Sequence, residues 1–228
     1  MIVWLASYPR SGNTLLRSML RQGFGLRSFS MYDDRTDLGA IPEIRDQTGH
    51  ELLGSTFAEF YERERDSPAL NLVKTHGPPL DSGRAIYIVR DGRSAIVSWY
   101  NMLINLRKRT DVSMIDLIFG RKVAFGDWSQ HLRAWNPRNR PQTLLLNYGD
   151  LLSNPESALN SISEFVGCQR TAEWRNDFDG LHQLFPQFFH RGSDEKNIAQ
   201  MTGEEQELYW SVHGQCMHDF GFEKSGQP

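Results

Sequence analysis

The chain has 228 residues, a formal net charge of -3, 39% hydrophobic residues and 23% charged residues. These values are typical of one soluble globular domain, and they exclude the broad positive field expected of a protein that binds nucleic acid or an anionic membrane. The two cysteines, Cys168 and Cys216, are too few for a disulfide framework and have no metal-binding spacing with histidine. The apolar run at residues 2–6 is too short for a membrane span and lacks the features of a signal peptide. We therefore expect a reduced, cytoplasmic protein with no membrane span and no nucleic-acid partner.

Short apolar runs rich in β-branched residues alternate with helical patterns along the chain. Strands are predicted at residues 2–6, 70–73, 85–89 and 143–146. Helical spacing of apolar residues is found around residues 15–20, 96–103, 155–166 and 202–216. This alternation predicts an α/β fold of three layers, in which a mainly parallel central sheet is flanked by helices, within a single domain over residues 1–228.

Capping signals predict where two of these helices begin and end. Asn154 and Pro155 suit the N-cap and the first helical position, and Gly167 would end that helix. Thr202 and Glu205 have the spacing of a capping box before the last helix.

Two stretches, residues 27–56 and 104–126, do not fit the alternation. Both are candidate loops or lids. The basic run at 107–109 in the second stretch is more typical of a solvated face than of a binding patch.

The first strand leads through a tight loop into a helix at residues 4–17. Such a loop directs backbone N–H groups and the positive end of a helix dipole toward an anion. Gly12 permits the turn, and Arg10 can bind phosphate or sulfonate oxygens as a fork. Further side-chain donors follow at Ser11, Asn13 and Thr14. The Walker A pattern and its lysine are absent, and the alternative is a capped helix with no ligand.

Lys74, Thr75 and His76 lie at the end of the second predicted strand. Ligands of open α/β sheets bind beyond the carboxyl ends of the strands, and a histidine there can take a proton from a hydroxyl. Lys74 and His76 share one side of an extended chain. The alternative is a surface histidine before the turn at 77–79.

Residues 87–98 again have the pattern of a strand, a turn and a helix. Arg90 ends the strand, Asp91 can cap the helix, and Ser98 lies about two helical turns along. The alternative is a capped helix with surface arginines, and Arg93 is a candidate for a solvated side chain.

These motifs, in this order, resemble those of the PAPS-dependent sulfotransferases, whose donor is 3′-phosphoadenosine 5′-phosphosulfate (PAPS). Residues 8–14 resemble the loop that binds the 5′-phosphosulfate. The Lys-Thr-His motif resembles the one holding the catalytic base, and residues 87–98 resemble the 3′-phosphate motif. The resemblance implies that His76 is the general base and that Lys74 and Arg10 assist catalysis. It also implies that Arg90 and Ser98 bind the 3′-phosphate.

Two weaker matches complete the resemblance. Tyr148 resembles a nucleotide contact of the family, although Gly149 replaces the usual glutamate, and a packed core tyrosine is the alternative. Arg191 and Gly192 resemble a clamp on the 3′-phosphate, in which His190 departs from the usual arginine.

The resemblance implies a P-loop-like fold and in-line transfer of a sulfuryl group from PAPS to an acceptor hydroxyl. The product would be 3′-phosphoadenosine 5′-phosphate (PAP). No metal is required, because cationic side chains can neutralise the developing charge. The acceptor is a small molecule or natural product that the sequence does not identify, and the oligomeric state is equally unknown. Two rival interpretations are a nucleotide or metabolite kinase, and a non-catalytic nucleotide-binding or scaffold protein.

Overall fold

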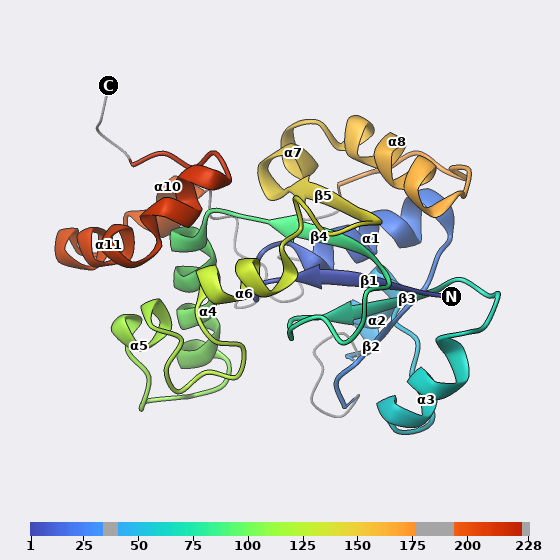
Figure 1. The fold of residues 1–228 in the computed structure, drawn as a ribbon, viewed down its shortest axis with the longest axis horizontal. Helices are drawn as coiled ribbons and strands as arrows, with labels where there is room; N and C mark the ends of the chain where they lie inside the picture. The colour runs from blue at the N-terminus through green and yellow to red at the C-terminus, as the bar shows by residue number, and fades with distance from the viewer. Residues whose placement is uncertain (34–40, 177–193, 225–228) are drawn as a thin grey trace. The chain divides into compact units, whose positions relative to one another are not determined.

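The computed structural model contains two compact units, whose helices and strands are labelled in Figure 1. It describes residues 1–33, 41–176 and 194–224. The described part of the first unit contains residues 1–7, 12–33, 41–88 and 137–176. The described part of the second unit contains residues 8–11, 89–136 and 194–224. The chain therefore passes from one unit to the other twice within a few residues, before Tyr8 and after Ser11.

A five-stranded sheet organises the first unit. Its strands are β1 (Ile2–Ser7), β2 (Ser28–Ser30), β3 (Asn71–Thr75), β4 (Arg84–Val89) and β5 (Thr143–Asn147). They lie in the order β2-β3-β1-β4-β5, and β1 pairs in parallel with both β3 and β4. The four predicted strands are confirmed. The edge strand β2, which pairs in parallel with β3, lies in a stretch that we expected to be a loop.

Helices cover both faces of this sheet, and the alternation of side chains along β1 shows how. The helices are α1 (Asn13–Phe24), α2 (Pro42–Thr48), α3 (Phe57–Glu64), α7 (Tyr148–Ser153) and α8 (Pro155–Val166). Val3 and Leu5 are fully buried in the core that α1 and α8 complete. Trp4 points to the other face, where its ring centroid lies 6.2 Å from that of Tyr61 in α3. The predicted three-layer α/β architecture is therefore confirmed.

The predicted helix ends are also confirmed. The Asn154 side chain accepts a hydrogen bond from the backbone N–H of Ser157, and Gly167 ends α8 in a left-handed conformation. Thr202 and Glu205 form the capping box of α11. Local hydrogen bonding is sufficient to set these ends, which is why the sequence predicts them.

The second unit is helical. Its helices are α4 (Gly92–Asn105), α5 (Met114–Ile118), α6 (Trp128–Trp135), α10 (Asp194–Ile198) and α11 (Gly203–Asp219). Helix α4 contacts α5, α10 and α11 (Figure 1). The buried His213 of α11 joins two further helices: Ser129 of α6 lies 2.7 Å from its Nδ1, and its Nε2 donates to the carbonyl of Ile118 in α5 at 2.8 Å. Within the described residues, no helix is long and apolar enough to cross a bilayer.

Candidate functional site

Gly12 begins α1 in a conformation and at a distance that only glycine tolerates. Its φ is 105°, and a Cβ at this position would lie 2.5 Å from Cδ2 of Tyr148. Gly12 has no side chain that could cap α1, and the first turn of α1 contains no acidic residue. The positive end of the helix dipole is therefore not neutralised by a carboxylate in that turn. The ring of Tyr148 thus packs directly against the loop that we predicted to bind an anion.

Asn13 has a structural contact rather than an open donor. Its Nδ2 donates to the carbonyl of Leu5 at 2.8 Å, which fastens the start of α1 to β1. Its Oδ1 is buried with no partner among the described residues. Thr14 follows in the first turn and is half-buried.

His76 is held by its ring and by its backbone. Nδ1 lies 2.8 Å from the carbonyl oxygen of Ser7. A carbonyl only accepts, so Nδ1 carries the proton and the lone pair of the neutral ring is on Nε2. The backbone N–H of His76 donates to the hydroxyl oxygen of Tyr32 at 2.6 Å. The half-buried imidazole therefore has a defined tautomer, with Nε2 as the basic atom.

Lys74 and His76 meet at one aromatic side chain. The Lys74 ammonium lies 5.7 Å from the centroid of the Tyr32 ring, and the same ring stacks beside the imidazole at a centroid distance of 6.1 Å. The spacing of two residues on one side of an extended chain predicts this juxtaposition. Sequence reasoning did not connect Tyr32 with His76, because the two residues lie 44 positions apart and no local pattern joins them.

Arg10, Arg90 and Ser98 form one network in the second unit. Nε of Arg10 donates to the hydroxyl of Ser98 at 3.1 Å, and Nη1 of Arg90 donates to the carbonyl of Arg10 at 2.8 Å. Arg10 has a φ of 65°, a conformation that is rare for a residue with a Cβ and is often found at functional sites. The neighbouring Ser11 has a buried hydroxyl with no partner among the described residues. Such an atom fits a loop whose partner is a ligand.

Asp194 joins this network from α10. Its Oδ1 accepts hydrogen bonds from Nε and Nη2 of Arg90, at 2.8 and 2.6 Å, and from the hydroxyl of Ser94 at 2.7 Å. Asn197, also in α10, donates to the same hydroxyl at 2.9 Å. Sequence reasoning missed Asp194, because no local pattern connects it to an arginine 104 residues away.

Arg93 is buried, not solvated as we had considered. Its guanidinium forms a two-pronged ion pair with Asp91, at 3.1 and 2.6 Å, and lies 5.1 Å from the centroid of the Trp210 ring. Asp91 also caps α4, as predicted. Asp91 therefore stabilises the start of α4, and Arg93 packs against Trp210 of α11. His190, Arg191 and Gly192 lie outside the described residues.

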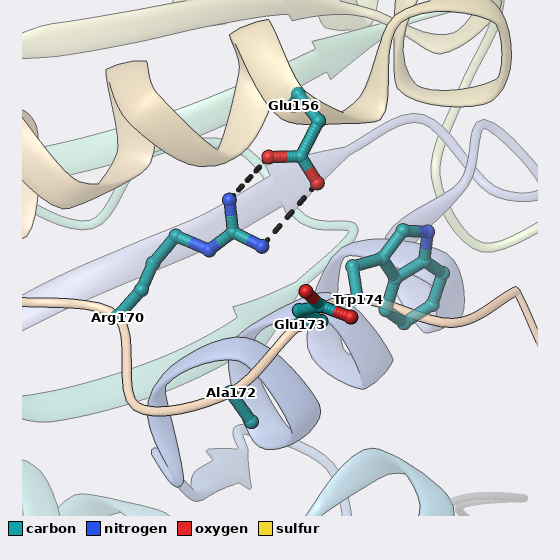
Figure 2. Close-up of a pocket in the computed structure, with 5 residues that line it drawn as sticks. All are labelled: Glu156, Arg170, Ala172, Glu173 and Trp174. Atoms are coloured by element: carbon teal, nitrogen blue, oxygen red, sulfur yellow. Dashed lines mark hydrogen bonds and ion pairs between the residues drawn. The ribbon is translucent and has the colours of Figure 1, made fainter.

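A separate hollow of about 580 Å³ lies beside α8 in the first unit (Figure 2). It is lined by Glu156, Arg170, Ala172, Glu173 and Trp174. Figure 2 shows Arg170 reaching across to the carboxylate of Glu156, with which it forms an ion pair. No residue predicted to act in catalysis or donor binding lines this hollow. The described residues also contain no cluster of three or more histidine, cysteine or carboxylate side chains that could hold a metal ion.

A comparison with known proteins matches almost the whole chain to one protein family. A family model described as the sulfotransferase domain matches residues 2–221. Sulfotransferase 1A1 of Rattus norvegicus is 31% identical over 179 residues, which cover 72% of this chain and 58% of that protein. Cytosolic sulfotransferase 3 of Arabidopsis thaliana is 24% identical over 177 residues, which cover 74% of this chain and 54% of that protein. The chain thus spans less than two thirds of the length of the curated relatives it matches.

Solved structures have the same fold. A retinol dehydratase in complex with androsterone and PAP matches with a TM-score of 0.68 and 16% identity, over 99% of this chain and 83% of that one. A mouse sulfotransferase in complex with PAP matches with a TM-score of 0.66 and 16% identity, over 96% of this chain and 87% of that one. These likenesses confirm the predicted P-loop-like fold class.

Proposed function

Because this chain belongs to the sulfotransferase domain family, we propose that it transfers a sulfuryl group from PAPS to an acceptor hydroxyl. The observation that carries the proposal is the hydrogen bond from Nδ1 of His76 to the carbonyl of Ser7. Because Nδ1 carries the proton in this bond, Nε2 keeps its lone pair. A general base needs such an unprotonated atom to take the proton of the acceptor hydroxyl.

In the proposed reaction, His76 takes the proton of the acceptor hydroxyl as its oxygen attacks sulfur in line with the departing phosphate. The S–O bond to the acceptor forms, the bridging S–O bond breaks, and PAP leaves. Lys74 and Arg10 neutralise charge on the sulfuryl and bridging oxygens, together with the backbone N–H groups of residues 11–14. These cations can supply the charge stabilisation, so the proposed reaction requires no metal, and EDTA is expected to leave turnover unchanged.

The remaining predicted donor contacts keep their assignments. Arg90 and Ser98 bind the 3′-phosphate, and the ring of Tyr148 contacts the nucleotide near Gly12. Arg191 and Gly192 complete the clamp on the 3′-phosphate.

We also propose an acceptor class, a domain organisation and a cellular location for this activity. The acceptor is a small-molecule or natural-product hydroxyl, in keeping with the androsterone and retinol named for structural neighbours. We propose a single catalytic domain over residues 1–228, in the cytoplasm, as the name of the Arabidopsis relative suggests.

Thermal unfolding with PAP and with ATP tests the donor assignment. A ligand at about 100 times its Kd stabilises the folded state by roughly 2.7 kcal/mol, which is several degrees in Tm for a chain of this size. A rise in Tm with PAP and little rise with ATP is the expected result. A rise with ATP alone would favour a kinase, and no rise with either nucleotide would refute the donor site.

Turnover then separates an enzyme from a binding protein. PAPS labelled with radioactive sulfur is incubated with a panel of phenols and alcohols, and transfer of label is measured. A protein that binds PAP but transfers label to no member of a broad panel would instead support the non-catalytic alternative.

A further inference from the structure

Three hydrogen-bond donors converge on one carboxylate oxygen in the second unit. Nε and Nη2 of Arg90 and the hydroxyl of Ser94 all lie 2.6 to 2.8 Å from Oδ1 of Asp194. Charge-assisted hydrogen bonds of this length are among the stronger interactions that fix a side chain. The contact is therefore a specific arrangement around one oxygen atom, rather than a loose surface ion pair.

The guanidinium of Arg90 is held on more than one side. Asp194 takes the edge formed by Nε and Nη2, and the carbonyl of Arg10 accepts from Nη1. The Arg90 residue is only 5% exposed. A guanidinium held in this way loses little conformational entropy when it binds an anion, whereas a free arginine side chain loses much more.

The carboxylate itself is supported by α10. Asn197, one turn after Asp194, donates to the Ser94 hydroxyl that in turn donates to Asp194. Two side chains of α10 thus hold one serine of α4. This polar chain fixes Oδ1 relative to α4, the helix that also contains Ser98.

From this geometry we propose that Asp194 is a positioning residue for the binding of PAPS: it orients Arg90 for the 3′-phosphate. This inference rests on the function proposed above, and it adds a residue that itself touches no atom of PAPS. Oδ1 alone accepts all three bonds, so the amide oxygen of an asparagine at this position can still orient Arg90, although without the assistance of the negative charge.

The test compares two nucleotides that differ only in the 3′-phosphate. Kd values for PAP and for adenosine 5′-phosphate are measured by calorimetry on the wild type, Asp194→Ala and Asp194→Asn. Asp111→Ala is the matched control, because it removes an Arg–Asp pair that is exposed and lies elsewhere in the same unit. Circular dichroism and Tm establish that each variant is folded.

We expect Asp194→Ala to weaken PAP binding by about tenfold or more, the usual scale for a hydrogen bond to a charged group, and to leave adenosine 5′-phosphate unaffected. Asp194→Asn should bind PAP more tightly than Asp194→Ala, and Asp111→Ala should bind PAP as well as the wild type. Equal losses for both nucleotides would overturn the proposal, as would an Asn variant as weak as the Ala variant. Unchanged or tighter PAP binding by Asp194→Ala would also overturn it, because the carboxylate would then be neutral to the phosphate or compete with it.

A measurement on the wild type covers the case in which Asp194→Ala does not fold. The Nε–H signal of Arg90 is assigned by NMR with Arg90→Lys and followed during titration with PAP. The signal should stay protected from exchange when PAP is bound, and its loss would mean that the phosphate displaces Asp194. A wild type that does not prefer PAP over adenosine 5′-phosphate would refute the proposed 3′-phosphate site itself, which is a different failure.

Discussion

Nε of Arg10 donates a hydrogen bond to the hydroxyl of Ser98 at 3.1 Å, although the two residues are 88 positions apart. One belongs to the first predicted donor motif and the other to the third. Their contact brings two side chains that are predicted to bind anions within hydrogen-bonding distance of each other in the second unit.

Ser98→Ala should weaken the binding of PAP more than the binding of adenosine 5′-phosphate. The lost hydroxyl is proposed to donate to the 3′-phosphate, and a hydrogen bond to a charged group contributes about 1.5 kcal/mol, or roughly tenfold in Kd. Calorimetry with both nucleotides measures the difference. Ser211→Ala in α11, which removes an exposed hydroxyl, is the control. Equal weakening for both nucleotides would refute our placement of the 3′-phosphate.

His76→Ala should lower turnover by roughly 10²-fold or more while the Kd of PAP stays nearly constant. The substitution removes the proposed base, and loss of an acid–base group commonly costs this much. Initial rates are measured with the acceptor found by the label-transfer screen. His218→Ala, at an exposed position in α11, should keep full turnover. Wild-type turnover in His76→Ala would exclude His76 from proton transfer.

Gly12→Ala should destabilise the protein and weaken PAP binding, because the new methyl group meets the ring of Tyr148. Gly25→Ala is the matched control: Gly25 also has a positive φ, of 67°, but a Cβ there meets no atom within 4 Å. Backbone strain alone costs about 1 kcal/mol, whereas strain with a steric clash costs about 3 kcal/mol or more. Urea denaturation compares the two free energies of unfolding. Similar losses in both variants would show that the ring contact contributes nothing.

The free energy of unfolding should fall as the pH drops below about 6.5, partly because of His213. Burial is the main cause that lowers the pKa of His213 from its ordinary value of 6.5. The Arg133 charge adds to this effect, and the hydrogen bond to Ile118 and the charge of Asp127 oppose it. Between the lowered pKa and 6.5 the unfolded chain binds more protons than the folded protein, so acid favours unfolding.

Urea denaturation at about pH 7.5 and at about pH 5.5, on either side of the ordinary histidine pKa, measures this loss of stability. In His213→Gln the amide can still donate to Ile118 but does not titrate, so the loss between the two pH values should be smaller. His218→Gln, at an exposed position, should show the wild-type loss. The same pH dependence in His213→Gln and the wild type would contradict this account.

The fold and much of the candidate site are local in origin, which is why sequence reasoning reached them. Apolar runs and caps predict the strands and helix ends, since these depend on neighbouring residues. The Lys-Thr-His motif places Lys74 and His76 on one side of the chain, and both contact Tyr32. The edge strand β2 was missed, because three residues are too few to show a period and its pairing with β3 is decided by the sheet.

By itself, the sequence determined the three-layer α/β architecture, the order of the motifs and the residue types able to bind an anion or accept a proton. Only the tertiary structure decided which side chains meet. It paired Arg90 with Asp194, made Tyr32 the acceptor for the backbone of His76, and buried Arg93 against Asp91 and Trp210. The physical reason is that the first set depends on short-range periodicity and chemistry. Contacts between residues tens of positions apart are set by the packing of whole elements, which no local pattern records.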